Sequence, residues 1–581
     1  MTKQIFRLGL AGAALLAAFT SCSDEQQFTN VNTDAKRVDV QQLSPEMAKV
    51  RDYVPLYACI AHRGSTFWAP EETEAAWRWA REMGVDYLES DLQVTKDGVV
   101  LANHDENFKR TTNVEDVFSD GVPTTRKDFY RTFRNADGSQ HFSEADIEAQ
   151  YNRDVADFRA NYAMSYYYAE ILMLDAGKWF NDDTPEQARS KFAAGHNGYY
   201  SYDANDVPTI HYSNGLYVSA LEDQINYAMG KKLNRNAEGE RILSYRIKPE
   251  YANMTLEEIY TASKAAVKCD DPSVVGSKAS KYMDFVEYSF GTIAGEDKWN
   301  DCKGNKAQAA YVQDDFDSGH RPGIYPEFKE SWLNPKDIEI RVYNILDEWG
   351  WNIITKKESE NTPFYVSGKV NVGKTNGKVI LQTFSFDALN RANSIFKGQI
   401  PMCYLLWLSN GGSTDMNYDT PQGYAAFIKW AQDHGAHIIG PSVQGAPNNY
   451  PEMNAPWMAY MIRKSGMINH PYSFDSYAQT AKYMGYYVNF WGENATQFDD
   501  LLGVTVQPTA YTTFSEAKFH PVYMDGFFTN RSEMSLQYMI ENGFRCSSTL
   551  DNPFHAGQKY DNSQAPHKVP NANDVLNALG Y

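Results

Sequence analysis

Two histidines and two carboxylates lie close together in the sequence and have residue types suited to acid–base or metal chemistry. His62 and His104 flank Glu89 and Asp91, which are two residues apart. Side chains two residues apart on a strand point to the same face, so these carboxylates are expected to project together. A carboxylate pair concentrates negative charge that a hard divalent cation neutralises. The pattern therefore predicts Glu89 and Asp91 as metal ligands and the two histidines as general base and acid.

A strand–helix–strand unit is expected to position these four side chains. Residues 56–61 form an apolar run that predicts a buried strand ending at His62. An acidic, proline-led start and small or apolar residues at helical spacing predict a helix over 70–83. Residues 85–94 predict the next strand, and the short apolar run 99–102 predicts an extension of it. Because strand ends converge at the carboxyl-terminal mouth of a parallel barrel, the four side chains are expected to share one site.

Arg63, which follows His62, indicates the chemical class of ligand. A guanidinium and a divalent metal both neutralise oxyanions, so together they suit a phosphate ester and the charge that develops in its transition state. A single histidine at a strand end is more often a packing or surface residue than a catalyst. Here His-Arg-Gly, Glu-x-Asp and His-Asp occur in order within one unit, and this joint pattern favours a catalytic site.

This segment resembles the glycerophosphodiester phosphodiesterase family, most closely its periplasmic bacterial form. The matching motifs are His62-Arg63-Gly64, Pro70-Glu71-Glu72-Thr73, Glu89-x-Asp91, Thr95-Lys96-Asp97-Gly98, His104-Asp105 and Arg110-Thr111-Thr112, with Gln382-Thr383-Phe384 similar to the family's QSF further along the chain. Two departures are visible: Glu72 replaces the Asn or His usual in the family, and the loop 65–69 is longer. Both bear on how a substrate fits more than on the chemistry.

Two later stretches extend the resemblance. Residues 321–329 are similar to the family's GIYPEIK strand. By that match, Glu327 is a third metal ligand, and Lys329, on the same strand face, contacts phosphate. Residues 524–530 are similar to the family's VDGLFTD strand, with Asn530 in place of the usual Asp.

Alternating strand and helix patterns predict an α/β TIM (β/α)8 barrel with a large insertion after the second strand region. Strands are expected near residues 57, 86, 322, 379, 402, 436, 486 and 524, and His470-Pro471-Tyr472 offers a second placement of the seventh. The expected parts are a signal peptide (1–21), a polar tether (22–50), the barrel domain (51–550) containing the insertion (113–321), and a tail (551–581). Within the insertion, residues 143–174 predict a helix and 195–217 a loop-rich lid or structural cover.

The composition excludes some classes of partner. The chain has 581 residues, of which 43% are hydrophobic and 22% charged, so it is long and apolar enough for a large globular core. A formal net charge of −20 argues against nucleic acid and against broad docking onto an anionic membrane. An anionic substrate therefore needs local positive groups or a metal.

The first residues predict export. Lys3 and Arg7 precede an apolar segment, 8–19, that is too short to span a bilayer and suits a signal-peptide core. Cys22 follows at the end of that core and resembles a bacterial lipoprotein cleavage site, at which it becomes the lipid anchor. A chance cysteine in an ordinary signal peptide is the alternative. The expected location is the outer membrane, facing the periplasm or the surface.

The resemblance implies a metal-dependent phosphodiesterase that converts small glycerophosphodiesters into glycerol 3-phosphate and an alcohol. His62 is expected as base and His104 as acid, with the roles exchanged in a second step. Ca2+ is expected ahead of Mg2+ at an all-oxygen site. The alternatives are hydrolysis of intact phospholipid headgroups and a lipid-anchored binding protein that keeps the barrel. The complete set of metal and acid–base residues argues against a pure binder, and the oligomeric state stays open.

Overall fold

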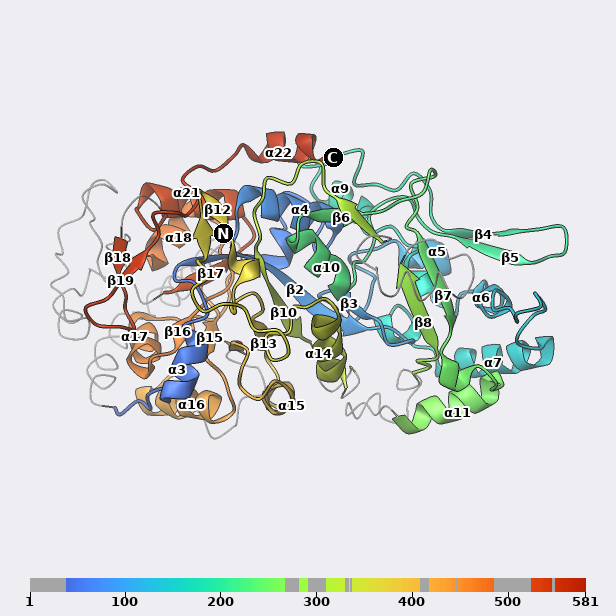
Figure 1. Cartoon of the computed structure of the whole chain (residues 1–581), viewed down its shortest axis with the longest axis horizontal. Helices are drawn as coiled ribbons and strands as arrows, with labels where there is room; N and C mark the ends of the chain where they lie inside the picture. Colours follow the sequence, from blue (N-terminus) through green and yellow to red (C-terminus); the bar gives the residue numbers. More distant parts are fainter. Residues whose placement is uncertain are drawn as a thin grey trace, which may run out of the picture.

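A closed barrel of eight parallel strands forms the centre of the molecule (Figure 1). The computed structural model describes residues 38–266, 282–290, 310–329, 334, 337–407, 417–445, 448–484, 524–545 and 549–581. The barrel strands are β1 (Ala58–Ala61), β2 (Tyr87–Val94), β10 (Gly323–Phe328), β13 (Leu381–Thr383), β14 (Met402–Leu406), β15 (Ile438–Pro441), β16 (Ile468–Asn469) and β17 (Gly526–Thr529). From β1 to β16 each strand pairs in parallel with the next, and β17 pairs with β1. The predicted TIM (β/α)8 fold is confirmed.

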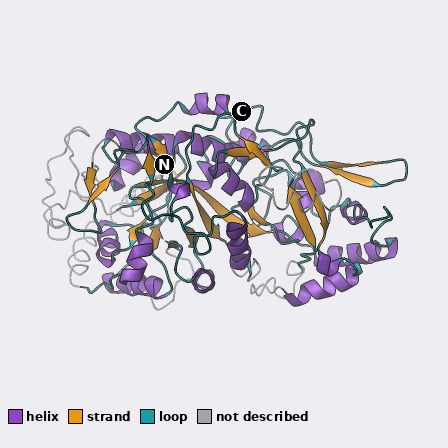
Figure 2. Ribbon diagram, viewed as in Figure 1, coloured by secondary structure: helices purple, strands orange, loops and turns teal. Residues whose placement is uncertain are grey.

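Helices surround the strands (Figure 2). Those that follow barrel strands are α4 (Glu74–Met83), α14 (Ile338–Glu348), α15 (Phe386–Phe396), α16 (Pro421–Asp433), α17 (Pro456–Ser465), α18 (Tyr477–Tyr483) and α21 (Ser532–Glu541). The helix α10 (Leu221–Ala228) packs on α4, β2 and β10 and covers the outside of the barrel between those two strands. None of the helices in the described ranges is long and apolar enough to cross a membrane.

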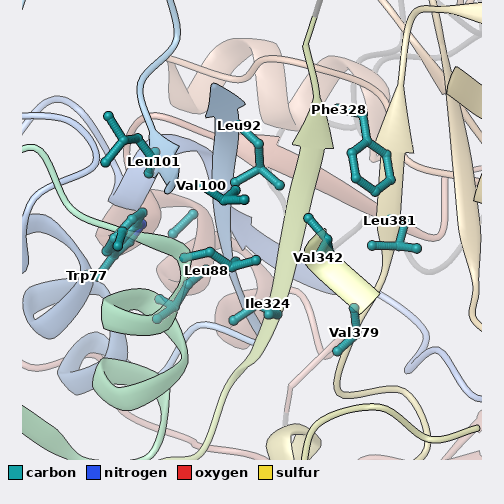
Figure 3. Packing of buried hydrophobic residues seen from close by; sticks show 14 of the residues in the cluster. Trp77, Leu88, Leu92, Val100, Leu101, Ile324, Phe328, Val342, Val379 and Leu381 are labelled. Atoms are coloured by element: carbon teal, nitrogen blue, oxygen red, sulfur yellow. The ribbon is translucent and has the colours of Figure 1, made fainter. Parts of the chain in front are cut away.

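The alternation of side chains along each strand separates two hydrophobic layers. One layer fills the barrel interior, with Ile60, Tyr87, Tyr325 and Phe528 among its members. The other lies between the strands and the helices and includes the residues of Figure 3, namely Trp77, Leu88, Leu92, Val100, Leu101, Ile324, Phe328, Val342, Val379 and Leu381. Because odd-numbered residues of β2 face inward, Glu89 and Asp91 point into the barrel, as the sequence predicts.

The seventh strand lies at the second of the two predicted positions. The segment 468–474 contains β16 and continues through the parallel bridges Ser442↔Tyr472 and Phe474↔Thr529, which join it to the strands on both sides. It therefore closes the barrel. The first predicted position, near residue 486, lies outside the described residues and is not needed for closure.

Residues 95–322 connect β2 to β10, and most of the elements described within them lie to the right of these strands in Figure 1. Their elements besides α10 are β3 (Val100–Ala102), α5 (Val114–Phe118), α6 (Arg126–Arg131), α7 (Glu144–Asp157), α8 (Tyr168–Ile171), α9 (Lys178–Asp183), β4 (Tyr199–Tyr202), β5 (Pro208–His211), β6 (Lys231–Leu233), β7 (Leu243–Ile247), α11 (Leu256–Ala266), β8 (Val286–Phe290) and β9 (Tyr311–Gln313). β3 pairs antiparallel with β2, as expected for an extension of that strand.

Three local predictions need correction. The helix expected over 70–83 starts only at Glu74, because Glu72 has a left-handed φ of 57°. The helix expected over 143–174 is interrupted: α7 ends at Asp157, because Phe158 is extended with ψ 133°, and the short helix α8 begins only at Tyr168. The loop expected over 195–217 contains the antiparallel hairpin β4–β5, which projects at the far right of Figure 1.

Both ends of the described chain pack on the barrel. Residues 38–50, the last part of the predicted tether, lie on the barrel surface: the Leu43 N–H donates to the Ser465 carbonyl, and Val50, the last residue of this part, is buried within α3 (Pro45–Arg51). The tail contains the hairpin β18 (Thr549–Asp551) and β19 (Lys559–Asp561) and ends in α22 (Ala572–Ala578). The Trp79 Nε1–H of α4 donates to the Ala572 carbonyl at 3.1 Å. A free tether can therefore extend no further than about residue 37.

A short antiparallel hairpin, β11 (Tyr365–Val366) and β12 (Lys369–Val370), precedes the barrel strand β13.

Candidate metal and acid–base site

The turn after β1 positions His62 and Arg63. The strand ends in a single 3-10 turn, His62–Gly64, in which Arg63 has φ 50° and Gly64 φ 86°. A Cβ on Gly64 would lie 2.6 Å from the Ala76 Cβ of α4, so only glycine fits between the turn and this helix. The Arg63 N–H donates to Glu89 Oε2 at 2.7 Å. The turn is thereby fixed to β2 and its carboxylates.

Three buried carboxylates meet at the mouth of the barrel. One oxygen each of Glu89, Asp91 and Glu327 lies within 4.8 Å of the others. The parallel register places Glu327 beside Asp91, with Tyr325 beside Glu89. The cluster therefore combines the two carboxylates predicted from spacing with the one predicted from resemblance.

The charges in this cluster are only partly compensated by protein groups. Burial and then the Asp91 charge raise the pKa of Glu89 well above its ordinary value, and burial raises the pKa of Glu327 to about 8. Burial also disfavours the charged form of Asp91, but Lys329, His104 and Arg63 together hold the pKa of Asp91 below its ordinary value. Asp91 Oδ2 is buried, and among the described residues it forms an ion pair with Arg63 but accepts no well-aligned hydrogen bond. Three convergent carboxylate oxygens fit a hard divalent cation.

Two cations border the carboxylates. Arg63 Nε lies 3.1 Å from Asp91 Oδ2, and Arg63 Nη1 lies 3.3 Å from Glu71 Oε1. Lys329 Nζ lies 3.2 Å from Glu327 Oε1 and 3.8 Å from Asp91 Oδ1. The two predicted phosphate-binding residues therefore come from different strand ends to the same carboxylate cluster.

His104 follows β3 and is held by a carboxylate. Its Nδ1 lies 2.6 Å from Asp105 Oδ1, and Asp105 in turn accepts from Arg110 Nε at 2.9 Å. Arg110 also forms a two-pronged ion pair with Glu71, at 3.0 and 2.6 Å. Burial, then Arg63 and Lys329, lower the pKa of His104, while Asp91 and Asp105 oppose that change. A partner carboxylate of this kind stabilises the imidazolium form.

His62 is held by a neutral group instead. Its Nδ1 lies 2.7 Å from the Asn530 side-chain oxygen at the end of β17. Burial and then Arg63 lower the pKa of His62 to about 3, against the opposing effect of Asp91. At neutral pH His62 is therefore a neutral imidazole, able to accept a proton.

Several residues of the site were missed by the sequence analysis. Gln382 at the end of β13 donates to Glu89 Oε1 at 2.9 Å, and Glu72 Oε1 accepts from the Asp91 N–H at 2.6 Å. The resemblance of residues 382–384 to the family's QSF was the available signal for Gln382. For Glu72 the signal was its departure from the usual residue type. Cys22 lies outside the described residues.

The raised pKa of Glu327 leads to a test of metal binding. Protons on Glu327 and Glu89 must leave before these carboxylates can bind a cation, so affinity is expected to rise with pH from 6 to 8. One displaced proton corresponds to about a tenfold change in the dissociation constant per pH unit. Calorimetric titration with Ca2+ or Mg2+ at pH 6, 7 and 8, in buffers of different ionisation enthalpy, counts the protons released. Glu327→Gln is the control; a pH-independent affinity in the unsubstituted protein would contradict the assignment.

The chain is similar in sequence to known phosphodiesterases. The profile of the glycerophosphoryl diester phosphodiesterase family matches residues 62–271. A glycerophosphoinositol inositolphosphodiesterase of Mus musculus is 40% identical over 86 residues, which are 15% of this chain and 16% of the relative. A glycerophosphodiester phosphodiesterase of Bacillus subtilis is 29% identical over 133 residues, 23% of this chain and 30% of the relative. The matches thus span less than a third of these curated relatives.

Among solved structures, the chain aligns with an Oleispira antarctica phosphodiesterase in complex with the product sn-glycerol-3-phosphate. It is 11% identical, the alignment covers 83% of this chain and 97% of that chain, and the TM-score is 0.34. A glycerophosphodiester phosphodiesterase from Agrobacterium tumefaciens is 13% identical, with coverage of 83% and 100% and a TM-score of 0.33.

Proposed function

The chain belongs to the glycerophosphodiester phosphodiesterase family, and from this premise we propose that it is a divalent-metal-dependent phosphodiesterase that cleaves small glycerophosphodiesters into glycerol 3-phosphate and an alcohol. One observation carries the proposal: contacts join both histidines to the carboxylates. The Arg63 N–H, next to His62, donates to Glu89 at 2.7 Å. His104 is connected to Asp91 through the contacts of Asp105, Arg110, Glu71 and Arg63. The acid–base pair and the carboxylate cluster are therefore parts of one site.

The proposed reaction has two steps, in which the histidines exchange roles. In the first, His62 Nε2 removes the proton of the glycerol 2-hydroxyl, whose oxygen attacks phosphorus, while His104 gives a proton to the departing alcohol oxygen. In the second, the imidazole of His104 removes a proton from water, which attacks the cyclic phosphate, and His62 returns its proton to the 2-oxygen. Both residues end in their initial protonation states.

The remaining side chains bind and orient the phosphate. Arg63 and Lys329 are proposed to bind the phosphate oxygens, and Glu89, Asp91 and Glu327 to hold the metal. When bound, the cation supplies positive charge and Lewis acidity at the phosphate. Ca2+ is proposed ahead of Mg2+, because Ca2+ accepts more oxygen ligands in less regular geometry. The hydrogen bond from Gln382 to the Glu89 carboxylate restricts how far that ligand can adjust to a stricter geometry.

The proposal is tested by the size of substrate that the protein accepts. Purified protein with added metal is expected to release glycerol 3-phosphate from glycerophosphocholine, glycerophosphoethanolamine or glycerophosphoinositol, and to leave intact phospholipid in mixed micelles uncleaved. Activity only on the intact lipid would replace the proposal by a phospholipase. Tight binding of the small diesters without turnover at any metal concentration would support the binding-protein alternative.

We also propose that the protein is an exported lipoprotein anchored through Cys22 in the outer membrane, on its periplasmic or surface face. Support comes from the basic residues, the apolar segment 8–19 and the cysteine that ends it. Replacing Cys22 by Ala is expected to move the protein from the detergent phase to the aqueous phase in Triton X-114 partitioning. Ser23→Ala is the matched control. Unchanged partitioning of the cysteine variant would contradict a lipid anchor.

A further inference from the structure

Three neighbouring strands of the barrel place His62, Asn530 and Asp475 side by side on the rim. His62 follows β1, Asn530 follows β17, and Asp475 follows the closing segment 468–474. The backbone joins the last two, since the Asn530 N–H donates to the Phe474 carbonyl at 3.1 Å. Asp475 thus lies two strands away from β1.

The three side chains form one chain of hydrogen bonds. Asn530 Oδ1 lies 2.7 Å from His62 Nδ1, and Asn530 Nδ2 donates to Asp475 Oδ1 at 2.5 Å. The other Asp475 oxygen accepts from Asn448 Nδ2. The same Asn448 nitrogen reaches the Ser473 carbonyl, which can only accept, so this nitrogen is a donor on independent grounds.

The direction of this chain follows from what each group can donate. Both oxygens of Asp475 accept hydrogen bonds, as expected for an ionised carboxylate, which has no proton to give. The NH2 group of Asn530 must therefore face Asp475, and its carbonyl oxygen must face His62. A carbonyl oxygen accepts only, so His62 Nδ1 carries the proton and Nε2 carries the lone pair.

We propose that Asp475 is a positioning residue for His62: it fixes the orientation of the Asn530 amide, and this amide fixes the His62 tautomer that has its lone pair on Nε2. The inference rests on the proposed function, in which His62 Nε2 is the base. It assigns a role to a residue that does not contact His62, and it accounts for the two histidines being held differently. His104 Nδ1 faces the Asp105 carboxylate directly at 2.6 Å, whereas an amide separates His62 from its carboxylate.

This arrangement also explains how the chain functions with Asn530 where the family it resembles has Asp. The negative charge is supplied by Asp475, which is separated from the His62 imidazole by the Asn530 side chain. The attraction between Asp475 and a protonated His62 is therefore weaker than that of a carboxylate at position 530, because it falls with distance. The tautomer is retained while the imidazolium receives less stabilisation. His62 therefore suits the role of base in the first step, and His104 the role of acid.

The first test replaces Asp475 by Asn, a change that preserves shape. The amide introduced at position 475 can accept or donate, so the Asn530 amide is no longer forced into one orientation. We expect kcat to fall by about 10- to 100-fold, as is usual for residues that orient a reacting group, with KM and metal affinity unchanged. Asn530→Ala removes the acceptor itself and should lower kcat by at least as much. Asp574→Asn, at an exposed carboxylate of α22, which packs on α4 outside the barrel, is the control.

The double variant Asn530→Asp/Asp475→Asn separates positioning from a structural role. It moves the carboxylate next to His62 and puts the amide behind it, so His62 Nδ1 again has an obligate acceptor. We expect it to recover most of the kcat lost in Asp475→Asn. A structural role for Asp475 predicts no recovery, because the double variant still lacks the acid at 475; that result would overturn the proposal.

A measurement that needs no turnover keeps this inference distinct from the proposed function. Nitrogen-15 NMR of histidine-labelled protein, with the His62 signals identified by their loss in His62→Ala, reports which ring nitrogen carries the proton. We expect a protonated Nδ1 in the unsubstituted protein and a mixture of tautomers in Asp475→Asn. The same tautomer in both proteins would overturn the inference. Loss of every activity with the expected NMR result would refute the proposed function alone.

Discussion

Replacing any one of Glu89, Asp91 or Glu327 by its amide is expected to lower kcat/KM by more than about 100-fold, which corresponds to about 2.7 kcal/mol of transition-state stabilisation. Each variant removes one of three convergent anionic oxygens and offers a neutral amide to the metal instead. Part of the loss is expected to be recovered at high metal concentration, since the amide oxygen remains a weak ligand. Enzyme assays across a metal titration measure both effects.

The fold should survive these substitutions. Burial raises the pKa of Glu89 and of Glu327, so without metal the protein already favours their neutral forms, and a neutral amide is a close substitute. The melting temperatures of Glu89→Gln and Glu327→Gln measured without metal should therefore fall little. Asp91→Asn should melt lower, because it loses an ionised carboxylate that Lys329 and Arg63 stabilise. With metal, all three variants should lose the metal-induced increase. Glu257→Gln, at an exposed carboxylate of α11, is the control. Full activity of any of these three carboxylate variants in the presence of chelator would refute the metal site.

His62→Ala and His104→Ala are each expected to lower kcat by about 10^2- to 10^4-fold on natural glycerophosphodiesters. Neither histidine belongs to the cluster of Glu89, Asp91 and Glu327 that is proposed to bind the metal, so the metal affinity of both variants should stay nearly unchanged. The two variants should differ on a diester with a nitrophenol leaving group, which departs without being protonated. His104→Ala should then recover toward the unsubstituted rate of the first step, whereas His62→Ala should not.

The opposite recovery would exchange the assignments of base and acid. The contacts of the two rings favour His62 as base and His104 as acid, because the carboxylate of Asp105 helps His104 to carry a proton and the amide of Asn530 gives His62 no such support. A burst of nitrophenol in His104→Ala, followed by slow release of glycerol 3-phosphate, would show that its role as base in the second step is still missing.

The sequence was sufficient to predict those parts of the site that depend on local patterns. Glu89 and Asp91 share a face because the strand period is two, and His62 and Arg63 follow a short apolar run that ends abruptly. Glu327 comes from a strand far along the chain, so spacing could not associate it with this pair; only the resemblance of residues 321–329 did so. The barrel register then places it beside Asp91.

Contacts between side chains that are far apart in sequence could not be predicted. Asp475 and Asn530 join His62 only because β17 lies between β1 and the closing strand, and the position of that closing strand was itself ambiguous. Two apolar stretches competed for the seventh position, and periodicity alone does not decide between buried strands of similar length. The early part of the predicted helix 70–83 failed for a related reason: Glu72 gives up helical geometry to accept the Asp91 N–H, a contact that no local pattern reveals.

The most direct test of the central claim is a phosphorus NMR time course of glycerophosphocholine with the purified protein and Ca2+ or Mg2+, compared with the same mixture containing excess chelator. The proposed function predicts disappearance of the diester signal and formation of glycerol 3-phosphate with free choline, in the metal-containing sample only. Formation of phosphocholine and glycerol, turnover that persists in chelator, or a diester signal that never changes with either metal would contradict it.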